Sequence, residues 1–269
     1  MSSSSPLPAG GPSELRDAAH ELADIADRIS TAAFRGHLDV RTKADGTWVT
    51  QVDEGIESAL REAIATKTAR DTGLEVEPEQ VVVTNGGKHA LYNVFMSLVD
   101  PGDEVLVPAP YWVSYPAQIQ LAGGTVVPVP TDKSTGFRAP VEVLEAHRTE
   151  RTKAVVFVSP SNPTGAVYPR EILEAMADIC RRHNLLLLSD EIYENITFDD
   201  AEMVNAATLT DDVLTITFSG LSKTWRVAGF RSGWLYVSGP THRASNYLEG
   251  LSLLMNMRMC ANVPAQHAI

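Results

Sequence analysis

Lys223 and Arg231 are the residues of this chain whose positions point most directly to chemistry. Lys223 lies just past the apolar run 213–218, which is typical of a buried strand, and Arg231 follows eight residues later. An amine in that place can carry a carbonyl cofactor, and a guanidinium can hold the phosphate of the same cofactor. Ser222-Lys223 alone is weak evidence, because most lysines are solvated surface residues, and Arg231 alone could form a surface ion pair.

A glycine pair further upstream predicts a place for that phosphate. Asn85-Gly86-Gly87-Lys88 separates the apolar run 81–84 from a helical stretch, 89–98. Two glycines at the start of a helix leave backbone N–H groups that point at one spot and bind anions. The simpler alternative is a strand–helix turn without a ligand.

Trp112 and Asp190 follow other apolar runs and suit a flat, cationic aromatic ring. The indole of Trp112 can stack on such a ring, although a tryptophan that packs beneath a loop is the commoner case. Asp190, in Ser189-Asp190-Glu191-Ile192-Tyr193, stands where a buried carboxylate is costly without a cationic partner. A protonated pyridine nitrogen is such a partner and makes the ring a stronger electron sink. A helix N-cap is the alternative for Asp190.

These motifs are expected at one edge of a sheet. From about residue 80, short apolar runs alternate with amphipathic stretches such as 170–183. This alternation predicts an α/β fold with a mostly parallel sheet, which binds ligands at the carboxyl ends of its strands. The expected strands are Val81–Thr84, Glu104–Pro108, Thr125–Val129, Ala154–Val158, Leu185–Ser189, Leu214–Phe218 and Trp234–Val237.

Six motifs follow one another along the chain: Gly-Gly-Lys, Trp, Asn-Pro-Thr-Gly, Asp-Glu-Ile-Tyr, Ser-Lys and Arg. Their order resembles that of class I pyridoxal-phosphate (PLP) aminotransferases of the aspartate/alanine type. The resemblance covers about residues 66–269. It implies a three-layer large domain with a seven-stranded, mostly parallel sheet in which the strand 234–237 is antiparallel. It also implies an enzyme with PLP as cofactor, and a homodimer if the fold is complete. The two cysteines, Cys180 and Cys260, indicate reduced residues of a cytoplasmic protein.

The resemblance assigns roles to individual residues. Lys223 carries the cofactor and moves a proton, and Asp190 pairs with the ring nitrogen. Tyr193 shares the phenolate oxygen with the asparagine of the Asn-Pro-Thr-Gly turn. The expected catalytic residues are Lys223, Asp190 and Tyr193, and no metal is expected. The implied cofactor-binding residues are Gly86, Gly87, Lys88, Trp112, Asn162, Asp190, Tyr193, Ser222, Lys223 and Arg231.

The implied activity is transfer of an amino group between alanine or aspartate and a 2-oxo acid such as 2-oxoglutarate. Gly220 departs from the family, since many relatives carry a phosphate-binding serine there. The chain also ends at Ile269, before the small domain whose arginine binds the substrate carboxylate. We therefore expect a C-terminally truncated large domain, and the first alternative is a PLP-binding protein with weak catalysis.

The beginning of the chain differs from the rest. Residues 20–65, with Lys43-Ala44-Asp45-Gly46-Thr47-Trp48-Val49-Thr50-Gln51-Val52-Asp53, resemble the N-terminus of inositol-monophosphatase-like enzymes such as histidinol phosphatases. A metal-dependent phosphatase is thus the second alternative, although the carboxylates that it needs are few and a solvated turn and strand is favoured here. The expected organisation is a disordered tail (1–13), a phosphatase-like helical and strand appendage (14–65) and the aminotransferase domain (66–269).

Composition limits the possible partners. The 269 residues carry 34 acidic and 22 basic side chains, a net charge of −12, which argues against nucleic acid and anionic membranes as partners. Cys180 and Cys260 are too few for a disulfide framework and lack metal-ligand spacing. The first thirteen residues lack the apolar core of a signal peptide, and no run is long enough to span a membrane.

Overall fold

The computed structural model describes residues 24–25, 28–29, 31–32, 40–42 and 48–256. The expected disordered tail, Asp45 and Cys260 lie outside these residues. The strands are β1 Val40–Thr42, β2 Trp48–Thr50, β3 Val81–Thr84, β4 Glu104–Ala109, β5 Thr125–Pro130, β6 Thr152–Val158, β7 Leu186–Asp190, β8 Thr215–Gly220 and β9 Gly233–Ser238. The α-helices are α2 Gln51–Thr72, α3 Gly87–Leu98, α4 Ser114–Leu121, α5 Val141–His147, α6 Arg170–His183 and α7 Ser245–Asn256.

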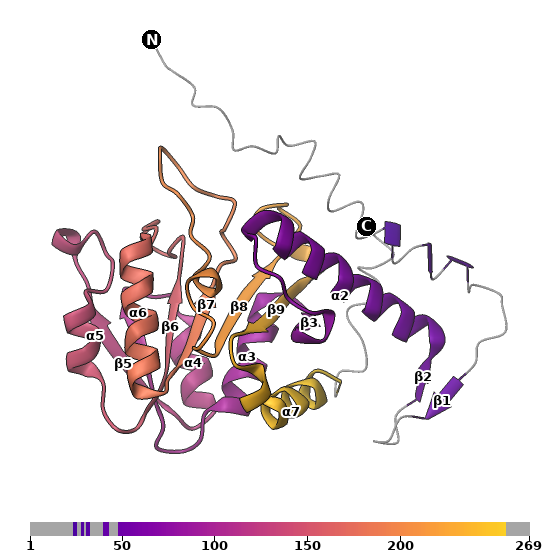
Figure 1. Cartoon of the computed structure of the whole chain (residues 1–269), viewed down its shortest axis with the longest axis horizontal. Coiled ribbons are helices and arrows are strands. Elements are labelled where there is room, and N and C mark those ends of the chain that lie inside the picture. Colours follow the sequence, from indigo (N-terminus) through magenta and orange to yellow (C-terminus); the bar gives the residue numbers. More distant parts are fainter. Residues whose placement is uncertain (1–23, 26–27, 30, 33–39, 43–47, 257–269) are drawn as a thin grey trace, which may run out of the picture.

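A seven-stranded sheet in the order β3-β9-β8-β7-β6-β4-β5 forms the centre of the molecule (Figure 1). The pairs from β5 to β8 are parallel, whereas β9 runs antiparallel to both β3 and β8. The prediction of a mostly parallel sheet whose one antiparallel member is the strand near 234–237 is therefore confirmed. The limits of the strands differ from the expected ones by one or two residues.

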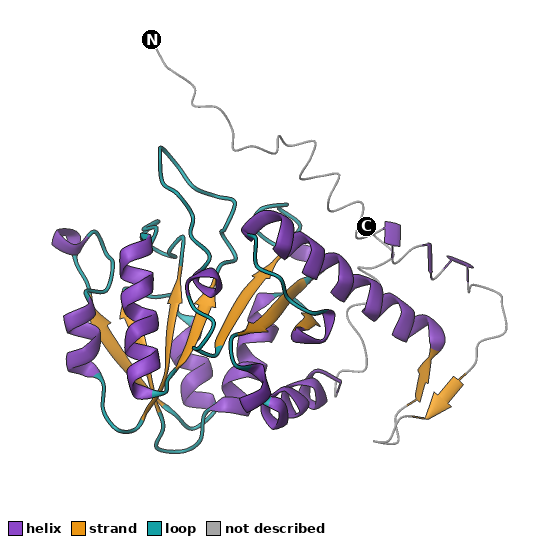
Figure 2. Ribbon diagram, in the orientation of Figure 1, coloured by secondary structure: helices purple, strands orange, loops and turns teal. Residues whose placement is uncertain are grey.

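Helices cover both faces of this sheet, so the three-layer architecture is also confirmed (Figure 2). On β4, Val105 and Val107 pack into a core shared with α3, α4 and α7, while Leu106 points into a second core with α5 and α6. This alternation follows from the two-residue period of a strand, and it explains why the central strands are apolar without interruption. Cys180, on α6, is buried in the second core and unpaired.

Helix α2 begins directly after β2. The strand ends at Thr50 and the helix starts at Gln51, so the favoured turn and strand end within the motif 43–53. Glu54, in the first turn of α2, suits the positive end of the helix dipole. The helix then runs for 22 residues through the expected domain boundary between 65 and 66. That division of the chain stays a prediction.

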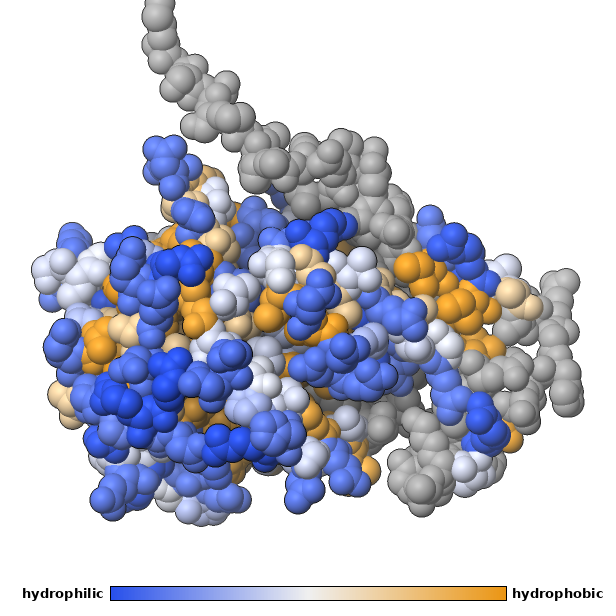
Figure 3. Space-filling model, in the orientation of Figure 1, coloured by the Kyte–Doolittle hydropathy of each residue, from blue (hydrophilic) through white to orange (hydrophobic). Residues whose placement is uncertain are grey.

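Figure 3 shows a surface that is largely hydrophilic on this side, with small apolar patches between charged groups. Ion pairs occupy part of it, such as those of Arg182 with Asp178 and Glu145. In the part of the chain that the structure describes, no helix is both long and apolar enough to cross a membrane.

Candidate cofactor site

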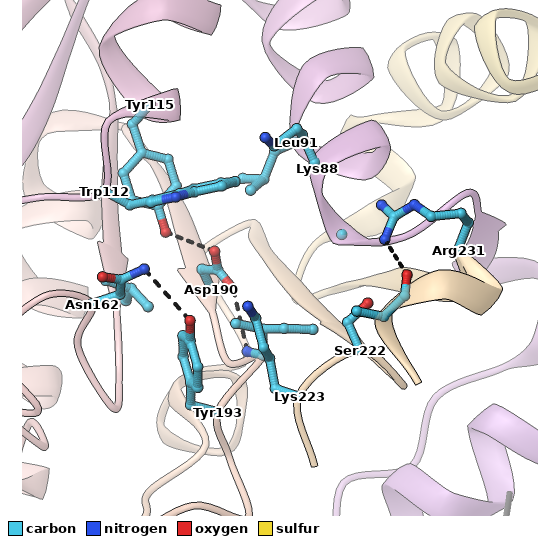
Figure 4. Close-up of a pocket in the computed structure, with 14 residues that line it drawn as sticks. Lys88, Leu91, Trp112, Tyr115, Asn162, Asp190, Tyr193, Ser222, Lys223 and Arg231 are labelled. Carbon is cyan, nitrogen blue, oxygen red and sulfur yellow. Dashed lines mark hydrogen bonds between the residues drawn. The ribbon is translucent and has the colours of Figure 1, made fainter. Parts of the chain in front are cut away.

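A cavity of about 330 Å³ opens at the carboxyl ends of the central strands, within the size range of small-molecule sites (Figure 4). It is formed by the loops and helix starts that follow β3, β4, β6, β7 and β8, as expected for an α/β sheet. All the predicted cofactor-binding residues except Gly86 line it: Gly87, Lys88, Trp112, Asn162, Asp190, Tyr193, Ser222, Lys223 and Arg231.

Gly86 lies immediately behind the cavity wall, where it is the N-cap of α3. Its φ of 80° is in the left-handed region, and a Cβ atom there would collide with the guanidinium of Arg231. Arg231 donates to the carbonyl oxygens of Ala228 (2.8 Å) and Asn85 (3.3 Å). It forms no ion pair within the described part of the chain, so the alternative of a surface ion pair has no support there. A guanidinium without an ion-pair partner, beside a helix N-terminus, is suited to a phosphate.

Asp190, the last residue of β7, is the buried carboxylate of the site, with 5% of its surface exposed. Its Oδ2 accepts a hydrogen bond from the Tyr115 hydroxyl at 2.6 Å, and its Oδ1 accepts one from the backbone N–H of Ile192 at 3.2 Å. A turn follows it, not a helix, so the N-cap alternative is wrong. Burial raises the pKa of Asp190 to about 6, although these hydrogen bonds and the positive charge of Lys223 oppose the shift.

Lys223 enters the cavity beside Tyr193, with its Nζ 5.5 Å from the centre of the tyrosine ring. The Asn162 side chain donates to the Tyr193 hydroxyl at 3.5 Å, so the residues predicted to share one oxygen of the cofactor do lie together. Figure 4 shows the amine of Lys223 between Asp190 and Tyr193. An amine, a carboxylate and a phenol thus face one small volume.

Trp112 forms the opposite wall with Lys88. The Lys88 Nζ lies 4.9 Å from the centre of the indole ring, and the ring of Tyr115 meets the same indole edge-on, with centroids 5.6 Å apart and planes at 86°. Trp112 borders the cavity, and its stacking on the cofactor ring stays a prediction.

Comparison with known proteins agrees with this geometry. The sequence pattern of the family described as aminotransferase class I and II matches residues 19–268. The chain belongs to this family. An alanine aminotransferase of Mycobacterium tuberculosis is 46% identical over 217 residues, which cover 80% of this chain and 50% of that protein. An aspartate aminotransferase of Streptomyces avermitilis is 51% identical over 183 residues, which cover 67% of this chain and 44% of that protein.

Solved structures give the same result. An aminotransferase from Escherichia coli superposes with a TM-score of 0.78 at 38% identity, over 97% of this chain and 61% of that one. An alanine aminotransferase from Pyrococcus furiosus superposes with a TM-score of 0.78 at 32% identity, over 97% of this chain and 63% of that one. This aminotransferase-family chain spans about half the length of the curated relatives that it matches.

The family match begins within the segment expected to resemble phosphatases, 14–65. The relatives named above are all aminotransferases, and they give the phosphatase resemblance no support. Side chains that could hold a metal do not gather in groups of three or more His, Cys, Asp or Glu anywhere in the described residues.

The residues of the cavity fit PLP, the cofactor of this family. Asp190 is buried without a cationic partner in ion-pair contact among the described residues, which suits a protonated ring nitrogen. At another part of the cavity, Arg231 and the start of α3 suit a phosphate, and the amine of Lys223 suits an aldehyde carbon. A flat ring with a protonated nitrogen, a phosphate and an aldehyde complements Asp190, Arg231 and Lys223 together.

Five residues that line the cavity were not among the predicted site residues. Four are apolar and supply walls: Leu91, Val158, Ile192 and Ala228. The fifth, Tyr115, contacts Asp190 across 75 residues of sequence. It stands three positions after Trp112, and only its nearness to that motif could have indicated a role.

Proposed function

We propose that this chain binds PLP and transfers an amino group between a small amino acid, alanine or aspartate, and a 2-oxo acid such as 2-oxoglutarate. The observation that carries the proposal is the convergence of Lys223, Asp190 and Arg231 on one cavity of about 330 Å³. The names of the relatives, alanine aminotransferase and aspartate aminotransferase, support the substrate class. The proposal includes a cytoplasmic location, from the two cysteines without disulfide spacing, and assembly as a homodimer, from the family resemblance.

When bound, PLP supplies an electron sink that stabilises negative charge on the Cα of the amino acid. Asp190 holds the proton on the ring nitrogen, since its carboxyl group, with a pKa of about 6, is ionised at neutral pH. Lys223 would take up the proton from Cα through its Nζ and hold it for return to the bound molecule. Its Nζ lies 5.5 Å from the centre of the Tyr193 ring, so the amine and the phenol border the same part of the cavity.

The remaining residues bind and orient. Arg231 and the N–H groups at the start of α3 bind the phosphate, and Asn162 with Tyr193 binds the phenolate oxygen. The indole of Trp112 would stack on a flat ring and limit its movement, which orients a bound substrate relative to the Lys223 amine. Lys88, beside Trp112, adds positive charge at the rim where a substrate carboxylate approaches.

Titration with PLP, followed by visible absorption, tests the proposal. We expect an absorption band that saturates at one PLP per chain, and formation of pyruvate or oxaloacetate when 2-oxoglutarate is added with alanine or aspartate. A saturable band without turnover would support binding alone. A chain that gives neither band nor product would overturn the proposal.

A further inference from the structure

Tyr115 lines the cavity and contacts two of its other residues, Asp190 and Trp112. It stands on α4 with 1% of its surface exposed, and its hydroxyl donates to Asp190 Oδ2 at 2.6 Å. Burial and the nearby negative charge of Asp190 hold the pKa of Tyr115 well above its usual range. The hydroxyl therefore keeps its proton and acts toward the carboxylate only as a donor.

The second contact of Tyr115 is with Trp112. The two rings meet edge to face, an arrangement that favours a fixed angle between them. Figure 4 shows the Tyr115 ring beside the indole, with its hydroxyl directed at Asp190. One side chain thus contacts both the group assigned to the cofactor's ring nitrogen and the group assigned to its face.

We propose that Tyr115 is a positioning residue, which orients the Asp190 carboxylate toward the cavity and keeps it negatively charged while fixing the indole of Trp112. The proposal rests on the proposed function for the identity of the ligand. The contacts themselves are properties of the chain.

The electrostatic surroundings of Asp190 explain why this hydrogen bond matters. The groups that face the carboxyl are the hydroxyl of Tyr115, the N–H of Ile192 and the charge of Lys223, with the Tyr193 phenol at the other side of the amine. Burial raises the pKa of Asp190, and the Tyr115 hydrogen bond is the largest effect that opposes the rise. Without it, a larger fraction of Asp190 is protonated near neutral pH and unable to pair with a cationic nitrogen.

The test compares Tyr115→Phe with Tyr168→Phe. The first change keeps the ring against Trp112 and removes only the hydroxyl. The second is a matched control, since Tyr168 is also buried (2% exposed), packs on Phe157, and uses its hydroxyl to accept from the Ala139 N–H, outside the cofactor site.

Two quantities are measured in the full chain: the pKa of Asp190 by carbon-13 NMR without cofactor, and the affinity for PLP between pH 5.5 and 8.5. In Tyr115→Phe we expect a higher Asp190 pKa and about tenfold weaker PLP binding near pH 6.5, recovering as pH rises. Tyr168→Phe should match the wild type in both. A loss of affinity that does not depend on pH, or an unchanged Asp190 pKa, would overturn the proposal.

A measurement on the wild-type chain protects the test against a variant that fails to fold. Exchange from H₂O to D₂O should shift the Asp190 carboxyl carbon signal, because the Tyr115 hydroxyl donates to it together with the Ile192 N–H; absence of the shift counts against the proposal. If the chain does not bind PLP at all, the proposed function fails, while the NMR results still decide whether Tyr115 positions Asp190.

Discussion

At the scale of single residues, Asp190 and Glu191 show how the same chemistry acquires different properties from position alone. Both are buried, but Asp190 lines the cofactor cavity. Glu191 instead accepts hydrogen bonds from the Ser189 hydroxyl, the Asn205 side chain and the Ala206 backbone N–H. Burial raises the pKa of Asp190 to about 6 and that of Glu191 to about 8. At neutral pH the first is mostly ionised and the second mostly protonated.

Replacement of Lys223 with Ala should abolish covalent attachment of PLP, since no other amine of the cavity lies beside Asp190 and Tyr193 among the described residues. The measurement is borohydride reduction followed by mass spectrometry, with far-UV circular dichroism to show an intact fold. Lys133→Ala, at an exposed lysine outside the cavity, is the control and should label like the wild type. Retention of one specifically labelled site in Lys223→Ala would refute the assignment.

Asp190→Asn should stabilise the cofactor-free chain at neutral pH and weaken PLP binding. The folded-state pKa of Asp190 is raised, so its ionisation favours the unfolded chain. The loss of folding free energy caused by this ionisation is absent below pH 3.8, grows between pH 3.8 and about 6, and reaches its full size above pH 6. Its size is roughly 3 kcal/mol at pH 7.

Urea unfolding of both proteins at pH 4 and pH 7 measures this effect. The difference in free energy of unfolding should be small at the lower pH and large at the higher one. Equal stability of the two proteins at pH 7 would show that burial of the charge costs nothing.

At the scale of elements, the site depends on how closely β9 approaches the start of α3. A Cβ atom on Gly233 would lie 2.6 Å from the backbone nitrogen of Gly87 and 2.7 Å from Gly86 Cα. Only a glycine in β9 permits this contact, which sets where the N–H groups of α3 point. The anion site is thus a joint product of the antiparallel strand and the helix.

Gly233→Ala should therefore lower the free energy of unfolding by about 1–3 kcal/mol and weaken PLP binding, because α3 must move. Gly250→Ala is a suitable control: it lies inside α7, has no neighbour within 4 Å of the added carbon, and should be neutral or slightly stabilising. Chemical denaturation and PLP titration of both variants make the comparison. If the two variants behave alike, the close approach is unimportant.

At the scale of the whole molecule, helix α2 joins the beginning of the described chain to the sheet. Ile64 and Ala65 are buried in a cluster with Val81, Trp234 and Tyr236 of β3 and β9. Lys67 forms an ion pair with Glu194 at 2.9 Å, and both side chains are largely buried. The two chain segments therefore share a core near the site, since Glu194 follows Tyr193.

Ile64→Ala should lower the stability of the entire sheet domain by about 2–5 kcal/mol, because the side chain is 3% exposed and its loss leaves a cavity. Leu121→Ala, at a leucine that is 67% exposed, should change stability by less than about 0.5 kcal/mol. Unfolding is followed by tryptophan fluorescence and circular dichroism together. A separate, earlier transition in Ile64→Ala would show that α2 unfolds independently of the sheet.

Much of the fold could be predicted from the sequence, because the signals for it are local. Uninterrupted apolar runs mark strands buried on both faces, and the polar residues after each run mark the loops at the carboxyl edge. Parallel strands bring those loops to one edge, so Trp112, Asn162, Asp190 and Lys223 were expected to meet, and they line one cavity. The antiparallel β9 was expected from the family resemblance, not from its residues.

The contacts that complete the site have no local signal. The hydrogen bond from Tyr115 to Asp190 requires the order of β4, β6 and β7 in the sheet and the packing of α4 in the core beside them. The Gly233 contact requires the pairing of β3 with β9 across about 150 residues. Residue types and periods specify which groups reach the edge of the sheet. The distances between those groups, and hence the charge of Asp190, depend on packing between elements remote in sequence.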